Sequence, residues 1–568
     1  MESLWTTRRF REDALVLALF ATVVHLLYAK TVQAGFVTDF TGLLGRLDGA
    51  PFLDFLTCFG FPAMHQVTNF FLFIFVKYFG VHGLPWYLVH TSLHIANGFL
   101  GYCLIKKILS NGGMEQPTLP ALAAALLFLL SPYQADAVVW KVCFNFLSCT
   151  LLMLGSLLFL VKYSEQGKQR HLLWSHGLFA LSRFTFELAL ALPFLAFVIA
   201  VARPFGTPST GRHDTQNGAS TTGPHHLLSF LKKITLPHIL LLGGYFLLNK
   251  IVLGGWVGHY GEDVHLRFEL RSIASNLLKY FTKYLFFWRE MPHGYRESLM
   301  AFFEKPSVAY IGLALGGLLL VAGIYFFKKM PPSLRVTGMG WLLFFLALLP
   351  VANLHVAWIL QGENDRYGYL ASLFFFTGLV GLLHLFHRYI CYGVLSLWLL
   401  ASAFYLNRTT VAWQAGASTV NALLDGFHWL DAPEVYVLAF PENYQGIPMF
   451  KDFSRQDLAL KHTLQYVAGK ETAGDFFQIA QFNMTGPADG VQVEVDSAGT
   501  FLVQFNQWGN WWWRNGIGTW DYEKERYTFN VDGNGSRIAL KKQPAPGAVF
   551  IYSQGGNWRT AVWSNEGK

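Results

Sequence analysis

The chain has 568 residues and a formal net charge of +8, with 53% hydrophobic residues and only 14% charged residues. Soluble domains average about 25% charged residues, so this composition excludes a soluble or disordered protein, and five cysteines are too few for a disulfide scaffold. We therefore expect a polytopic α-helical membrane protein with one soluble part and no disulfide. Surplus Lys and Arg are typical of cytoplasmic loops in membrane proteins and do not indicate a nucleic-acid partner.

Apolar runs predict the membrane-spanning helices, each of which needs about 20 residues. Eleven runs approach that length, at 13–30, 85–105, 118–131, 138–161, 171–182, 185–202, 236–254, 306–327, 336–351, 367–386 and 389–405. Two of these runs are short enough to need support from neighbouring helices. No small-residue cleavage site follows the first run, so we expect a retained helix and not a signal peptide.

Basic residues between the runs predict the orientation in the membrane. With Arg8, Arg9 and Arg11 in the cytoplasm, every short basic loop falls on the cytoplasmic side. An odd number of spans then places the C-terminal part outside, in the periplasm if the membrane is a bacterial inner membrane or in the lumen of a eukaryotic host. The same orientation predicts two long outer loops, at 31–84 and 255–305.

The sequence changes character after the last run, which divides the chain into a membrane domain at 1–405 and an outer domain at 406–568. Gly, Asn and Asp turns such as Asp532–Gly535 separate stretches of alternating hydrophobicity, a pattern typical of antiparallel β-structure. These stretches are Val491–Val495, Thr500–Phe505, Tyr527–Val531 and Val549–Tyr552. Before them, Val435–Phe440 predicts a lone strand with helical stretches around it, so the outer domain is expected to be β-rich (α/β).

Five acidic residues fall at the outer ends of predicted spans. They are Asp39, Asp136, Glu187, Glu363 and Asp365. Ionisable groups at membrane depth are costly and are functional candidates by default. Their position on one side of the membrane indicates an outward-facing active site, although simple solvation at the interface explains carboxylates there equally well.

Three sequence blocks carry a resemblance to a known class. Ser131–Trp140 resembles the His-Pro-x-x-x-Glu-x-Val-x-Trp signature of multispanning GT-C glycosyltransferases. Val67–Gly80 followed by Trp86–Asn97 resembles the Leu-Thr-Asn…Phe-Gly…His-Leu-x-Asn…Leu-His-x-x-Asn block of these proteins. Leu348–Asn353 followed by Asp365–Leu370 resembles their Leu-Leu-Pro-x-x-Asn…(Asp/Glu)-Arg-Tyr-x-Tyr-Leu block. The chain is similar to the transmembrane O-mannosyltransferases with tetratricopeptide tails and to their bacterial relatives.

The resemblance covers about residues 10–405 and has clear departures. The family usually carries paired acids in the first outer loop, whereas Thr38 here precedes a single Asp39. Ser131 stands where His is common, Asp136 stands where Glu is common, and a β-rich domain replaces the tetratricopeptide tail. The resemblance therefore extends to the fold and the reaction class but not to the identity of the substrate.

The resemblance implies an inverting, metal-independent transferase without a cofactor. Such an enzyme moves a sugar from a polyprenyl-phosphate donor to an acceptor hydroxyl of a glycan, lipid or protein on the outer face. By family position, Asp39 is the expected general base, because an acceptor hydroxyl must lose its proton to become a good nucleophile. Asp136 would orient the base or the acceptor. Arg366 is the first candidate for the donor phosphate, because a planar guanidinium fits phosphate oxygens and a leaving phosphate needs cations.

Two further pairs of cations are candidates for binding the donor phosphate. Arg267 and Arg271, and likewise Lys279 and Lys283, are spaced i,i+4, so each pair shares one helix face. Snorkelling toward lipid headgroups explains the same positions without a ligand. Weaker site candidates, chosen by position alone, are His65 (at the place of the family's Arg-Pro), Tyr369, His259 and Tyr260.

His90, His94 and Asn97 recur at helical spacing in the second span. A His pair at i,i+4 is able to bind zinc, but no Glu follows the first His as in the metalloprotease motif. We interpret the three residues as packed, hydrogen-bonded helix residues, and we predict no metal site.

The outer domain is rich in tryptophan. Trp508, Trp511 and Trp513 are candidates for stacking on sugar rings, yet consecutive residues of a strand alternate between sheet faces, so some of these rings belong to a core. Two other functions compete with the transferase: a transporter or flippase of lipid-linked glycans, and a catalytically inactive, glycan-binding membrane scaffold. Transport is disfavoured because no inverted repeat is visible, whereas Thr38 in place of an acid leaves the scaffold open.

Overall fold

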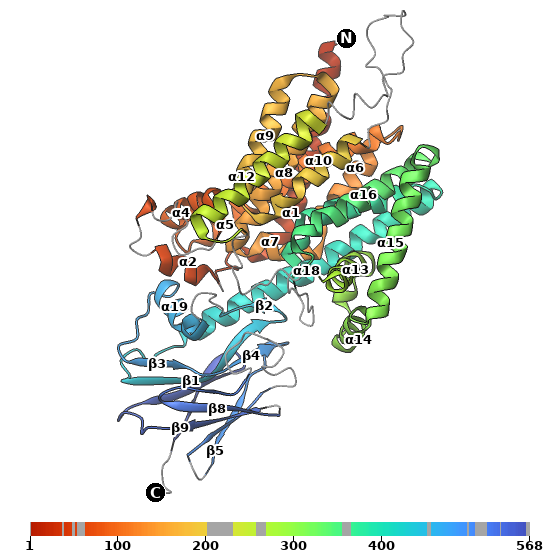
Figure 1. Ribbon diagram of the computed structural model, residues 1–568. Helices are drawn as coiled ribbons and strands as arrows, with labels where there is room; N and C mark the ends of the chain where they lie inside the picture. The colour runs from red at the N-terminus through yellow and green to blue at the C-terminus, as the bar shows by residue number, and fades with distance from the viewer. Residues whose placement is uncertain are drawn as a thin grey trace, which may run out of the picture.

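The computed structural model describes residues 2–36, 39–47, 51–53, 63–201, 231–256, 269–354, 365–450, 456–496, 499–505, 520–533 and 535–563. These residues form a helical part followed by a C-terminal part with two β-sheets (Figure 1). The N-terminus lies at the end of the helical part that is far from the sheets (Figure 1). The chain therefore has the predicted architecture of a helical membrane protein with a C-terminal β-rich domain.

Among the described residues, eight helices are long and apolar enough to span a membrane, or nine if one bent pair counts as a single span. The eight contain α1 (Glu2–Tyr28), α5 (Gly83–Asn111), α8 (Phe144–Gln166), α12 (Leu236–Leu253), α15 (Pro306–Phe326), α16 (Pro332–Leu348), α17 (Tyr369–Leu383) and α18 (Arg388–Asp425). α16 and α17 reach spanning length together with the adjoining 3₁₀ turns, as Pro332–Val351 and Asp365–Leu383. The bent pair is α6 (Thr118–Leu130) with Pro132–Val139, at an angle of 56°.

All eleven predicted runs are helical, but three of them do not form an unbent helix of spanning length, even with the turns that adjoin them. They form α6, α9 (Gln169–Arg183) and α10 (Leu192–Val201). An apolar run predicts burial, whereas a span also needs an unbroken helix. Pro132, for example, has no backbone N–H to continue the hydrogen-bond ladder of α6, so the chain turns there.

Short elements fill the ends of the bundle. The remaining helices are α2 (Asp39–Leu47), α4 (Gln66–Phe79), α7 (Ala135–Val139), α13 (Leu270–Phe286), α14 (His293–Phe303) and α19 (Ala459–Tyr466). The 3₁₀ turns that concern the site are η2 (Pro132–Gln134), η3 (Lys141–Cys143), η4 (Glu187–Ala191), η6 (Trp288–Glu290), η8 (Leu349–Val351) and η9 (Asp365–Gly368). η9 contacts both η2 and α7, so two of the resembling blocks meet at these turns.

The first β-sheet is built around β1 (Glu434–Tyr444), which is buried along its whole length. Its parallel partners are β10 (Val549–Gln554), β3 (Asp475–Gln478) and β4 (Gln481–Met484). Two strands pair antiparallel, β2 (Ile447–Pro448) with β1 and β11 (Asn557–Ala561) with β10. The prediction of a lone strand was wrong, because a strand covered on both faces shows no alternation from which partners can be inferred.

The second β-sheet is antiparallel throughout, as predicted. Its strand order is β5 (Gln492–Val495), β6 (Phe501–Gln504), β9 (Gly535–Leu540), β8 (Tyr527–Asp532) and β7 (Tyr522–Glu523). Three of the four alternating stretches form β5, β6 and β8, and the fourth forms β10 of the first sheet.

α18 joins the two parts. The domain boundary expected at residue 405 lies inside this helix, which continues to Asp425. Trp558 of β11 donates its indole N–H to the carbonyl of Leu423 at 2.7 Å. The ammonium group of Lys470 donates to three carbonyls at the helix end, those of Leu424, Asp425 and Phe427. A cation at a helix C-terminus is favourable, so the sheet part is fixed to the last turn of α18.

The predicted orientation is testable with introduced cysteines. Lys168, between α8 and α9, and Glu471, in the sheet part, are both exposed. We expect a membrane-impermeant maleimide to label Glu471→Cys in intact cells and to label Lys168→Cys only after permeabilisation. The unsubstituted chain is the control, because the described cysteines are buried or only partly exposed. Labelling in the reverse pattern would place the sheet part in the cytoplasm and overturn the orientation.

Candidate functional site

Five charged residues gather around η9, at the start of α17. We call them the η9 cluster: Asp136, Lys283, Arg289, Asp365 and Arg366. They come from α7, α13, η6 and η9, which are up to 230 residues apart in the chain. The cluster contains three cations and two carboxylates.

The first half of the cluster is the pair Asp136–Arg366. Nη1 of Arg366 donates to Oδ2 of Asp136 at 3.1 Å, and the backbone N–H of Arg366 donates to the same oxygen at 3.2 Å. The guanidinium lies over the rings of Trp140 and Tyr367, at 4.7 and 4.8 Å from their centroids. Side-chain exposure is 15% for Arg366 and 4% for Asp136. This pair joins the two resembling blocks 131–140 and 365–370.

The second half of the cluster is centred on Asp365. Its Oδ1 accepts from Nζ of Lys283 at 3.0 Å and from Nη1 of Arg289 at 2.6 Å. Both cationic side chains are fully buried, and the Asp365 side chain is 6% exposed. Charges removed from water need partners of opposite sign, so this carboxylate keeps two buried cations in place.

Aromatic rings surround Lys283. Its ammonium lies within 4.8 Å of the ring centroids of Tyr133, Tyr280 and Tyr284. Burial lowers the pKa of Lys283 to about 8, an effect that the neighbouring carboxylate of Asp365 opposes. The rings shield the cation from water and attract it through their negative faces.

Glycine at position 368 allows α13 to approach η9 closely. The Tyr284 hydroxyl donates to the carbonyl of Gly368 at 3.1 Å, and a Cβ on Gly368 would lie 2.1 Å from that hydroxyl. Asn276, two turns earlier on α13, donates to the carbonyls of Ala352 and Leu354, which follow η8. These contacts hold α13 so that Lys283 faces Asp365.

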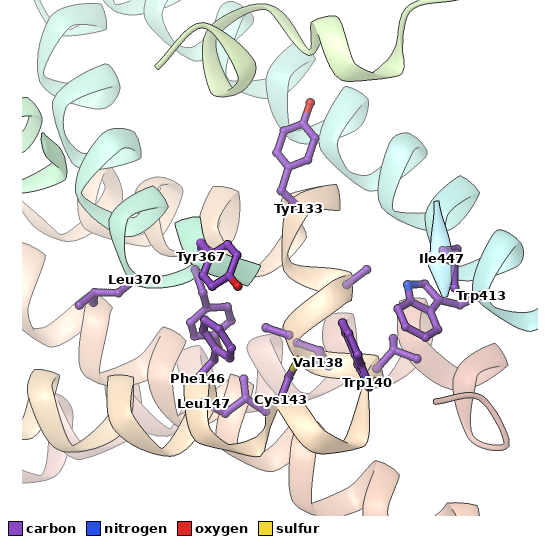
Figure 2. Close-up of a cluster of buried hydrophobic side chains, with 14 of the residues drawn as sticks. Tyr133, Val138, Trp140, Cys143, Phe146, Leu147, Tyr367, Leu370, Trp413 and Ile447 are labelled. Carbon is purple, nitrogen blue, oxygen red and sulfur yellow. The ribbon is translucent and has the colours of Figure 1, made fainter. Parts of the chain in front are cut away.

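Two site candidates that the sequence named separately form a second polar pair. His65 Nε2 lies 2.9 Å from Oε2 of Glu187, although 122 residues separate them. The ring of Phe186 packs on Phe146 at 4.5 Å between centroids, and Phe146 packs on Tyr367 at 5.7 Å. Figure 2 shows Phe146 and Tyr367 side by side in the buried cluster. Aromatic rings therefore connect the His65–Glu187 pair with Tyr367 beside the η9 cluster.

The other described candidates lie outside the cluster. Lys279 is buried and pairs with Glu304 at 3.5 Å, and Arg271 donates to the carbonyl of Glu304 at 2.7 Å, so both join α13 to α14. The Tyr369 hydroxyl lies 2.7 Å from Nδ1 of His94 and 3.2 Å from the amide nitrogen of Asn97. This buried network packs α17 against α5, as expected for His94 and Asn97.

Several candidates lie outside the described residues. They are Glu363, Arg267, His259, Tyr260, Trp508, Trp511 and Trp513, together with the side chain of Asp39. The backbone of Asp39 is described and begins α2. Within the described ranges, no group of three or more His, Cys, Asp or Glu side chains is arranged to hold a metal ion.

Three buried cations were missed in the sequence, Arg289, Lys141 and Arg183. Arg289 follows Phe287, whose left-handed backbone (φ 49°) ends α13, so helical spacing from Lys283 does not reach it. Lys141 directly follows the Trp140 signature residue and is 1% exposed, with its ammonium 5.7 Å from the ring centroid of Phe36. The position of Lys141 directly after the signature block is the one sequence feature that could have marked it as a candidate.

Comparison with models of protein families finds no match, and comparison with curated proteins finds none either. Weak similarity to solved structures covers about four fifths of the chain. ArnT from Cupriavidus metallidurans bound to undecaprenyl phosphate gives a TM-score of 0.32 at 12% identity, over 81% of this chain and 85% of that one. Its apo structure gives 0.31 at 13% identity, over 82% and 86%. The archaeal oligosaccharyltransferase AglB from Archaeoglobus fulgidus, in complex with an inhibitory peptide and a dolichol-phosphate, gives 0.36 at 12%, over 82% and 64%.

Charge balance in the η9 cluster is testable by substitution. Asp365→Asn leaves Lys283 and Arg289 without their carboxylate, and breaking a buried ion pair costs about 3–5 kcal/mol. We expect the free energy of unfolding in detergent micelles to fall by that amount. Combining Asp365→Asn with Lys283→Met removes one unbalanced cation and should restore part of the loss.

The matched control is Asp425→Asn, which changes an exposed carboxylate and should alter the same free energy by no more than about 0.5 kcal/mol. A free energy of unfolding for Asp365→Asn equal to that of the control would show that Asp365 does not balance the two cations.

Proposed function

We propose that the protein is a membrane glycosyltransferase of the GT-C class. It transfers a sugar from a polyprenyl-phosphate donor to an acceptor hydroxyl on the outer face of the membrane. One observation carries this proposal: a buried ion-pair cluster that includes Arg366 lies where two of the three resembling blocks meet. A departing polyprenyl phosphate is an anion, and cations held in place before the reaction stabilise charge that develops in the transition state.

Arg366 is the residue we assign to the donor phosphate. It is the most exposed cation of the η9 cluster, since the side chains of Lys283 and Arg289 are fully buried. Asp136 and the rings of Trp140 and Tyr367 fix its guanidinium plane. Lys283 and Arg289 are both bonded to Asp365, the residue before Arg366, and so hold Arg366 in place.

Asp39 is the residue we assign as general base, and the backbone around it supports the assignment. Gly35, four residues earlier, lies against the signature block: a Cβ there would be 2.1 Å from the carbonyl oxygen of Val139. The Gly35 carbonyl also accepts the backbone N–H of Lys141 at 3.4 Å. The chain at Gly35 therefore lies beside the segment that contains Asp136. Because Asp136 is paired with Arg366, its role is to position groups and not to take the proton.

The first test concerns the base. Asp39→Asn is nearly isosteric, so the variant should fold and bind donor while losing transfer activity by 10²–10⁴-fold, the usual contribution of base catalysis. The measurement is sugar transfer in purified membranes supplied with a panel of polyprenyl-phosphate-linked sugars.

Asp48→Asn is the control, since Asp48 shares the predicted outer loop without the family position. Collapse of transfer in Asp48→Asn with normal transfer in Asp39→Asn would move the base to Asp48. If neither the variants nor the unsubstituted chain transfers sugar, the transporter or the scaffold would be favoured over the transferase.

The second test concerns donor binding. Hydrogen bonds to charged groups contribute about 1.5–3 kcal/mol, so Arg366→Gln should weaken binding of polyprenyl phosphate in nanodiscs by about 10–100-fold. Arg366→Lys keeps the charge but loses the planar fork, so its affinity should lie between those of the unsubstituted chain and Arg366→Gln. Arg335→Gln, in the first turn of α16, is the control, because Arg335 bonds only locally to the carbonyl of Met330. Equal affinity in all four proteins would make Arg366 a structural residue.

A further inference from the structure

α2, the helix that begins at Asp39, is weak by its own sequence. It has nine residues, and two of these, Gly42 and Gly45, are glycines. Isolated helices shorter than about 12 residues are marginal in water, and glycine lowers the stability of a helix further. The helical state of α2 therefore depends on the elements that pack against it.

One face of α2 packs on the helical part. The rings of Phe40 and Trp86 lie 5.3 Å apart between centroids, and Leu43 belongs to the same buried cluster. Leu44 and Leu47 pack against this cluster as well. The four α2 residues are spaced i, i+3, i+4 and i+7, so they share one face of the helix. The opposite face is left for a different element.

The sheet part makes the contact on the opposite face. Gly45 follows Phe40 by five residues, which places it about 140° around the helix axis from Phe40. α19 packs against α2 and lies between it and the sheets (Figure 1). A Cβ on Gly45 would lie 3.0 Å from Cε2 of Tyr466 and 3.4 Å from the hydroxyl oxygen of the same residue. Glycine at this position therefore allows the ring to approach, and α2 is held between the helical part and Tyr466.

α19 is itself fixed to the first sheet. Its side chains Leu460 and Leu464 are fully buried. The backbone N–H of Lys461 donates to the side-chain oxygen of Gln478, on β3, at 3.0 Å. The sheets are in turn fastened to the end of α18. The position of the Tyr466 ring is therefore set by the sheet part and not by α2.

We propose that Tyr466 is a positioning residue, whose ring keeps α2 helical and in place and so sets the position of Asp39, the first residue of that helix. The proposal rests on the transferase function proposed above, in which Asp39 is the general base. A base acts only within hydrogen-bond reach of the proton that it takes, and a misplacement of about 1 Å costs about 100-fold in rate. The sheet part thus contributes to the reaction without touching the substrate.

The first measurement is sugar transfer by Tyr466→Ala in the full-length protein. We expect kcat to fall by about 10–100-fold because the base is misplaced. Binding of polyprenyl phosphate should stay unchanged, because Arg366 lies on η9 and not on α2. Tyr466→Phe keeps the ring and should transfer sugar like the unsubstituted chain. Gln465→Ala, at the neighbouring half-buried position of α19, is the control and should also match the unsubstituted chain.

The second measurement is hydrogen exchange of the α2 amides at 43–47, which does not depend on activity. Tyr466→Ala removes one of the two supports of α2, so exchange should become about tenfold faster, a typical effect of one lost contact on local opening. Adding Gly45→Ala to Tyr466→Ala should slow exchange again by about fivefold, because alanine favours the helix over glycine. The Cβ of this alanine has room once the ring is gone.

A further variant acts from the side of α2 and covers the case in which Tyr466→Ala does not fold. Gly45→Leu should push the ring away and lower kcat as Tyr466→Ala does, although leucine favours helices. Adding Tyr466→Ala to Gly45→Leu should restore part of kcat. Normal kcat in Gly45→Leu overturns the positioning role.

Unchanged exchange in Tyr466→Ala, or the same increase in Gln465→Ala, overturns the hold of the ring on α2. Faster exchange with normal kcat, or weaker binding of polyprenyl phosphate by Tyr466→Ala, overturns the positioning role. All of these results leave the transferase function standing. Failure of that function is separate, because it shows as no transfer by the unsubstituted chain. Exchange still decides in that case: an increase that Gly45→Ala reverses supports the hold on α2, and no increase overturns it.

Discussion

The carboxylate of Asp365 is the constraint on which the arrangement of the segments around η9 depends. A carboxylate and two cations that have left water are stable only while they remain together, so Asp365 fixes Lys283 on α13 and Arg289 on η6 at the start of α17. The next residue, Arg366, extends the same constraint to Asp136 on the bent segment after α6. Segments far apart in the chain thus share one electrostatic requirement, and none of them is able to move alone.

Much of the helical part and the centre of the candidate site could be predicted from the sequence, because both depend on local patterns. Apolar runs gave all eleven helical segments, and the resembling blocks contained Asp136, Asp365 and Arg366, which the structure brings together. Arg289 could not be predicted, since the left-handed Phe287 breaks the helical spacing that would relate it to Lys283. Sequence position alone named His65 and Glu187, but only the fold shows that they form a pair.

The sheet part shows where local pattern stops being informative. Alternation predicted β5, β6 and β8 because their sheet has one face that is less buried than the other. β1 is buried along both faces, and one of its parallel partners is β10, more than 100 residues later in the chain. Its central position in the sheet and the identity of its partners therefore could not be predicted from its own residues. The end of α18 could not be predicted for a similar reason. Its apolar stretch ends well before the helix itself ends at Asp425.

The unbroken course of α18 has a mechanical consequence. At 1.5 Å per residue, its 38 residues form a rod about 57 Å long, nearly twice the thickness of a typical hydrocarbon core of about 30 Å. One section of the rod lies in the lipid, and another carries Arg408, Thr409 and Gly416, beside which the β1–β2 hairpin sits. A helix adjusts to bilayer thickness by tilting. Since Lys470 and Trp558 fasten the sheets to the end of the rod, a tilt imposed by the lipid swings the sheets as one body, so the thickness of the membrane sets the position of the sheets relative to its surface.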